Sequence, residues 1–160
     1  MDNPALTNLY ADKDLILNFL ATFSKFEYAL KVSGYYTTYK RGEAKADWPR
    51  FTKEVSNQLD IESSENLKTA FNFILKYPLQ LLGEKDGKMD WILFDIGEIE
   101  QDLDKVIFKI KQIRNNTFHG GKFLRAPEDE QTNSLLLKHS ITTLLEIKNL
   151  SKKIRSAFES

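Results

Sequence analysis

Apolar residues recur at three- and four-residue intervals in the first part of the chain, over residues 12–33. Because an α-helix completes a turn in about 3.6 residues, this spacing places them on one face and predicts an amphipathic helix. Ser33 and Gly34 end the pattern, as turn-forming residues do. Glu27 lies within the apolar stripe, where a carboxylate needs a cationic partner. The stripe consists of Ile16, Phe19, Leu20, Phe23, Phe26 and Leu30.

Two shorter helices are predicted in the next part of the chain. Asp47 is a typical N-cap and Pro49 suits the first turn, so one helix is expected to run through Leu59. A serine pair then precedes a second helix at about 64–77. That helix is expected to end before Pro78, because proline disfavours the helical conformation of the residue that precedes it.

The two longest periodic stretches lie in the C-terminal half of the chain. The first predicts a helix at about 97–116, and a loop over 120–126 follows it. The second predicts a helix at about 128–157, whose first turn carries carboxylates that interact favourably with the helix dipole. Together with the earlier helices, these predict an all-α bundle of about five main helices, folded as a single domain over residues 1–160.

Two stretches lack a helical period. Residues 35–42 contain three tyrosines beside Lys40 and Arg41. They predict either a stacking platform for unpaired bases or aromatic rings that close a loop over the core. Residues 79–95 contain apolar runs on both sides of Asp86 and a following glycine. This pattern predicts a small hairpin or, equally, an irregular flap packed on the helices.

The charge balance and the absence of cysteine narrow the function classes. The chain carries 23 basic and 23 acidic side chains, so any binding to RNA or to a membrane surface needs a local patch. A chain with no cysteine has no disulfides, thiol catalysis or thiolate metal sites. We expect no signal peptide at its start, and no apolar run approaches membrane-spanning length. These features predict a soluble, cytoplasmic protein with no membrane partner.

The candidate chemistry lies at the end of the helix predicted over 97–116. Arg114 follows the apolar positions at helical spacing, so its guanidinium is expected near the buried face with Glu27 as its partner. Weak helix formers and a glycine pair come next, so we expect the helix to loosen and His119 to turn back toward Arg114. An Arg that holds a phosphodiester and a His that exchanges protons with ribose and leaving oxygens need neither metal nor cofactor.

Polar and basic neighbours of the pair suit the same chemistry. Asn115 and Asn116 are predicted to orient the imidazole or to bind a phosphate oxygen. Lys122 and Arg125, in the following loop, are predicted to bind RNA. The surrounding region contains basic residues with no acidic residue among them, which favours a phosphodiester backbone, although a solvated helix face explains about half of such runs. The basic residues are Lys105, Lys109, Lys111, Arg114, Lys122 and Arg125.

The same residues also have a structural interpretation. A His before a glycine pair stabilises a helix C-terminus through the helix dipole, and Arg114 beside Glu27 forms an ordinary ion pair. An Arg followed by a His four to six positions later occurs by chance in about every second or third chain of this length. His139, the other histidine, is predicted to be an ordinary surface residue of the last helix.

The run from Arg114 to Lys122 resembles the signature of the HEPN superfamily (higher eukaryotes and prokaryotes nucleotide-binding domains). In that signature an Arg, usually followed by a polar residue, precedes a His by a short interval. Here Asn115 is the polar residue, and four residues separate Arg114 from His119. The first helix also resembles that of the family, through Phe23, Phe26, Glu27, Leu30 and Gly34.

The resemblance implies a HEPN-like helical bundle that forms a homodimer and brings two Arg–His motifs into one cleft. It implies a metal-independent endoribonuclease that leaves cyclic 2′,3′-phosphate ends, with Arg114, Asn115 and His119 as catalytic residues. Such proteins often act as toxins or antiviral defence effectors, so an antitoxin or regulatory protein is an expected partner besides RNA. The alternative is a non-catalytic helical module that binds a nucleotide, RNA or a protein through the same residues.

Overall fold

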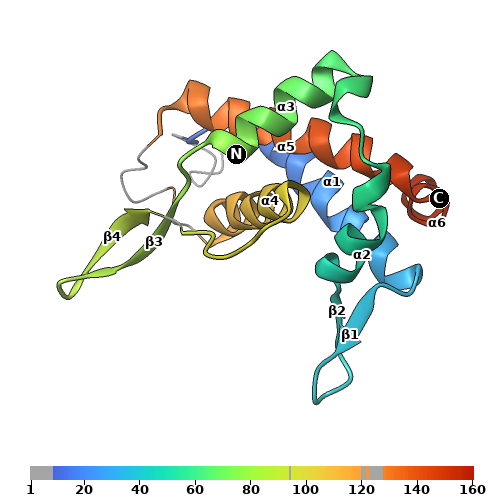
Figure 1. Ribbon diagram of the computed structural model, residues 1–160. Coiled ribbons are helices and arrows are strands. Elements are labelled where there is room, and N and C mark those ends of the chain that lie inside the picture. Colours follow the sequence, from blue (N-terminus) through green and yellow to red (C-terminus); the bar gives the residue numbers. More distant parts are fainter. Residues whose placement is uncertain (1–8, 94, 120–121, 123–127) are drawn as a thin grey trace, which may run out of the picture.

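The computed structural model describes residues 9–93, 95–119, 122 and 128–160, and these residues are mostly helical (Figure 1). The predicted helical architecture is therefore confirmed, and two small antiparallel hairpins are added to it. The helices are α1 (Lys13–Val32), α2 (Trp48–Val55), α3 (Glu65–Lys76), α4 (Asp102–Phe118), α5 (Glu130–Ile147) and α6 (Lys152–Glu159). Short 3-10 turns occur at Ser56–Gln58, Ile61–Ser63 and Lys148–Leu150.

Side-chain caps fix the starts of the first three helices. Asp12, Asp47 and Ser64 each accept a hydrogen bond from the backbone N–H three residues further on. These starts agree with the sequence patterns. The helix that was predicted to run through Leu59 is shorter, because α2 ends at Val55 and continues only as a 3-10 turn.

The single long helix predicted over residues 128–157 is wrong. The chain leaves α5 through a 3-10 turn, and Ser151 adopts an extended conformation with φ −128° and ψ 118°. Its hydroxyl then accepts a hydrogen bond from Ile154 N and starts α6 as a separate helix. The break changes the direction of the chain, so that α6 packs against α1 and buries Ile154 completely.

Helix α4 begins later and ends later than the sequence predicts. Gly97 has φ 59°, a left-handed conformation that does not continue an α-helix, and the helix begins only at Asp102. At the other end the helix reaches Phe118, and the backbone N–H of His119 donates to Asn115 O at 2.9 Å. The expected loosening of the backbone before His119 is therefore wrong.

Both stretches without a helical period form hairpins. Strands β1 (Tyr36–Thr38) and β2 (Ala44–Ala46) pair, and strands β3 (Gln80–Lys85) and β4 (Lys88–Leu93) pair across a turn at Asp86 and Gly87. Both turn residues have positive φ, 53° and 75°, as a tight type I′ turn requires. The hairpin alternative for residues 79–95 is thus confirmed, with Phe94 outside the described residues.

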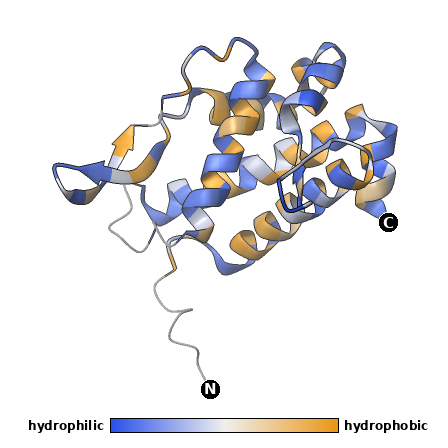
Figure 2. Cartoon of the chain, turned by 90° about the horizontal axis from the view of Figure 1, so that it is seen from below, coloured by the Kyte–Doolittle hydropathy of each residue, from blue (hydrophilic) through white to orange (hydrophobic). Residues whose placement is uncertain are grey.

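The core lies where α1 meets the other helices. Each helix carries both hydrophilic and hydrophobic residues along its length (Figure 2). Phe26 of α1 stacks on Trp48 of α2 with ring centroids 4.9 Å apart and also contacts Phe51. Tyr35 packs edge-on against Phe51, whereas Tyr36 and Tyr39 are exposed on the first hairpin, so this tyrosine cluster is divided between core and surface. Among the described residues, no helix is long and apolar enough to cross a membrane.

Candidate functional site

Arg114 lies on α4 and is held against α1. Its guanidinium carbon is 5.1 Å from the ring centroid of Phe23 and 5.7 Å from that of Phe118. Its side chain is 30% exposed, so the group is partly desolvated and still reachable from solvent. Contact with two aromatic faces stabilises the cation in this position.

Polar contacts fix the orientation of the guanidinium. Nη1 of Arg114 donates to Asn115 Oδ1 at 2.9 Å, and Nη2 lies 3.8 Å from Glu27 Oε2. The other carboxylate oxygen of Glu27 accepts a hydrogen bond from Trp48 Nε1 at 3.2 Å. The predicted proximity of Glu27 and Arg114 is confirmed. Asn115, which was predicted to orient the imidazole or to bind a phosphate oxygen, contacts the guanidinium.

His119 is the C-cap residue of α4, and its side chain is exposed. Residues five positions apart on a helix diverge by about 140°. Since α4 stays helical through Phe118, His119 does not turn back toward Arg114 in the way that the sequence predicted. Within the described part of the chain, no hydrogen bond or ion pair joins the two side chains. Phe118, which adjoins His119, does contact the guanidinium, so both groups belong to the same helix end.

Asn116 has a structural position. It is buried, its Oδ1 accepts from Gln112 Nε2 at 2.8 Å, and its Nδ2 donates to Gln80 O at 2.8 Å. These bonds join α4 to the start of β3. The supporting role predicted for Asn116 stays a prediction, and both ends of its amide are bonded inside the protein.

Lys122 is also an internal residue. Its Nζ lies 2.6 Å from Glu128 Oε2, and the two side chains are only 5% and 3% exposed. The same ammonium lies 5.3 Å from the ring centroid of Trp91 on β4. The RNA-binding role of Lys122 stays a prediction, and the structure instead pairs and buries its charge. Arg125, the other predicted RNA-binding residue, lies outside the described residues.

Fewer of the basic side chains are available to a ligand than the sequence predicts. Lys105 pairs with Asp102 at 2.9 Å, and Lys109 is buried and donates to two carbonyl oxygens at the end of α3. Lys111 remains, half-buried beside Lys45 of β2 and Arg114. Burial lowers the pKa of Lys111, and the positive charges of Lys45 and Arg114 lower it further, whereas Glu27 raises it. Lys45, Lys111 and Arg114 therefore form a cationic cluster whose charges interact.

Sequence reasoning missed two features of the structure. Lys45 belongs to the first hairpin, and only the pairing of β1 with β2 and its packing on α1 bring it near α4. His139, predicted to be an ordinary surface residue, packs against Phe73 with ring centroids 4.6 Å apart, and burial lowers its pKa. The imidazole of His139 is therefore partly inside, whereas that of His119 is exposed at a helix end.

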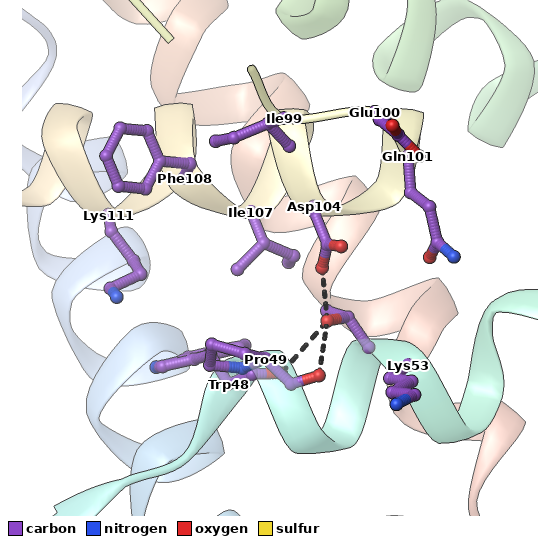
Figure 3. Close-up of a pocket in the computed structure, with 11 residues that line it drawn as sticks. Trp48, Pro49, Lys53, Ile99, Glu100, Gln101, Asp104, Ile107, Phe108 and Lys111 are labelled. Carbon is purple, nitrogen blue, oxygen red and sulfur yellow. Dashed lines mark hydrogen bonds between the residues drawn. The ribbon is translucent and has the colours of Figure 1, made fainter. Parts of the chain in front are cut away.

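A groove adjoins the cationic cluster between α2 and α4 (Figure 3). Its volume is about 600 Å³, and Trp48 and Lys111 contribute to its wall. The predicted catalytic residues Arg114, Asn115 and His119 do not line it. Trp48 nevertheless connects the groove to Arg114, because its indole N–H is bonded to the carboxylate that faces the guanidinium.

Comparison of the chain with protein-family models, with curated proteins and with solved structures gives no significant match. The functional interpretation accordingly rests on the residues and geometry described above.

Proposed function

We propose that this protein is a metal-independent endoribonuclease of the HEPN type, with Arg114 and His119 as its principal catalytic residues. The observation that supports this proposal is the arrangement of groups at the end of α4. His119 presents an exposed imidazole there. Five positions earlier, Glu27, Asn115 and two aromatic rings hold the guanidinium of Arg114 in place. A guanidinium fixed before the substrate arrives stabilises phosphate charge without reorganising during the reaction.

The chemistry assigned to these groups is transesterification. A neutral imidazole takes the proton of the ribose 2′-hydroxyl, and the 2′-oxygen attacks the adjacent phosphorus. The bond from phosphorus to the 5′-oxygen breaks, and an imidazolium gives a proton to that oxygen, leaving a cyclic 2′,3′-phosphate and a 5′-hydroxyl. Arg114 offsets the charge on the non-bridging oxygens.

The proposal includes a homodimer, because one His cannot start in both protonation states. Two copies that face each other through the ends of α4 would supply one neutral ring and one imidazolium. The exposed ring of Phe118 lies at this end and offers apolar area for such a contact. A toxin or defence role, with an antitoxin or regulatory protein as partner, belongs to the same proposal.

A non-catalytic module that binds a nucleotide, RNA or a protein is the second candidate. The observation that favours it is the number of contacts that Arg114 makes within the fold, with Glu27, Asn115 and Phe23. A purely structural ion pair makes the same kinds of contact. Lys122 and Glu128 form such a pair elsewhere in this chain.

The test is to incubate purified protein with single-stranded RNA in the presence of a chelator. We expect cleavage, products with cyclic 2′,3′-phosphate ends, and no cleavage where the nucleotide on the 5′ side of the scissile bond is a 2′-deoxynucleotide. An identical DNA strand is the matched control. Binding of RNA without any cleavage would favour the non-catalytic module, and cut DNA would reject the 2′-hydroxyl mechanism.

A further inference from the structure

Apolar and polar side chains both line the groove between α2 and α4. Figure 3 shows Phe108 and Lys111 at one end and Glu100 and Gln101 at the other, with α4 above and α2 below. The ring of Phe108 is 39% exposed. The residues that give the groove its apolar lining are Trp48, Pro49, Ile99, Ile107 and Phe108.

The walls of the groove are fixed by contacts within the protein. The hydroxyl of Thr52 on α2 donates to the carboxylate of Asp104 on α4 and ties the two helices together across the floor. Trp48 is almost completely buried and is held by its stack on Phe26 and its bond to Glu27. The groove is therefore present before any ligand arrives, and its volume of about 600 Å³ lies within the range of small-molecule sites.

A lysine lies at each end of the groove, Lys111 beside Phe108 and Lys53 at the opposite end (Figure 3). Lys53 shares its end with the carboxylate of Glu100. Burial, followed by the positive charge of Lys45, lowers the pKa of Lys111, so its ammonium gains from an added anion. An occupant with a flat aromatic ring and a phosphate therefore matches the end of the groove that Phe108 and Lys111 line.

We propose that this groove binds one unstacked base of the RNA strand, next to the bond that is cleaved. The base lies against Phe108, and its phosphate lies at Lys111 at the same end of the groove. Because Lys111 and Arg114 are three positions apart on α4, they are neighbours on the helix surface, so the strand passes from the groove to the guanidinium. This inference rests on the proposed ribonuclease function and adds a base-binding subsite to it.

The test is a titration of the full chain, followed by NMR, with each of the four ribonucleoside 5′-monophosphates and with ribose 5-phosphate, which lacks the base. We expect at least one nucleotide to bind about tenfold more tightly than ribose 5-phosphate. Phe108→Ala should lower the affinity for that nucleotide about tenfold, the loss expected from removing one base–aromatic stack. The same substitution should leave the affinity for ribose 5-phosphate unchanged.

Leu145→Ala is the matched control, because Leu145 is 37% exposed on α5 and does not line the groove. Phe108→Leu keeps apolar volume and removes the aromatic face, so it serves if the alanine variant does not fold. Equal affinity for nucleotides and ribose 5-phosphate, or unchanged nucleotide binding in both Phe108 variants, would overturn the proposal. If the protein cleaves RNA but binds no nucleotide, the base-binding subsite is rejected and the ribonuclease function stands. If it binds a nucleotide but does not cleave RNA, the ribonuclease function is rejected and the base-binding groove stands.

Discussion

Replacing His119 by alanine should slow RNA cleavage by about 10²–10⁴-fold, the usual contribution of a positioned general acid–base. The side chain is exposed at the C-cap of α4, and its backbone N–H, which alanine retains, makes the capping bond to Asn115 O. The free energy of unfolding should therefore change little. Initial cleavage rates and thermal unfolding of the variant and wild type, prepared in parallel, give both quantities.

His139→Ala is the control for this substitution. That ring packs on Phe73, away from the end of α4, so its loss should lower stability and leave the cleavage rate of the folded protein unchanged. A His119→Ala protein that cleaves RNA at the wild-type rate would remove His119 from the mechanism. If the His119→Ala and His139→Ala preparations retained the same reduced rate of RNA cleavage, the remaining activity would be that of a contaminating nuclease.

Replacing Lys122 by methionine should lower the free energy of unfolding by about 3–5 kcal/mol, because it leaves a buried carboxylate without its partner. Glu128 is 3% exposed, and the ammonium of Lys122 is its ion-pair partner at 2.6 Å. Tyr77 lies near the same carboxylate, and burial together with Glu128 raises the pKa of its phenol to about 12. Tyr77 thus stays neutral and cannot compensate for the lost cation. Denaturant unfolding measures the change.

The double variant Lys122→Met, Glu128→Leu is the matched control. With both charges replaced by apolar groups, most of the lost stability should return. An RNA-binding role for Lys122 predicts the opposite pattern, with weaker RNA binding by Lys122→Met and unchanged unfolding. That result would show that the buried ion pair contributes little and would restore Lys122 to the RNA-binding surface.

The sequence predicts the helices well where caps and apolar stripes agree. Asp12, Asp47 and Ser64 all cap the helices that follow them. The failures occur where tertiary packing outweighs local periodicity. The apolar pattern of the last helix continues past Ser151, but the chain breaks there and α6 folds back onto α1. Gly97 similarly lies in a left-handed conformation where the helix was predicted to begin, and α4 starts only at Asp102.

Of the candidate site, the sequence predicts the pair of Glu27 and Arg114, because two opposite charges inside apolar stripes need each other. It does not predict which basic residues are used internally. Lys109 and Lys122 look like Lys111 in sequence, yet they bind carbonyl oxygens and a buried carboxylate. Their partners lie at the end of α3 and just before α5, and the sequence does not show that these come close to Lys109 and Lys122. The contribution of Lys45 also depends on the pairing of the first hairpin.

If Arg114 and His119 act on the same phosphodiester, the cleavage rates of Arg114→Ala, His119→Ala and the double variant should show it. Groups that act as one catalytic unit give strongly non-additive losses. We expect the double variant to cleave RNA hardly more slowly than the slower single variant. Losses that multiply in the double variant, or an Arg114→Ala protein with wild-type activity, would show that the two residues do not share one phosphodiester.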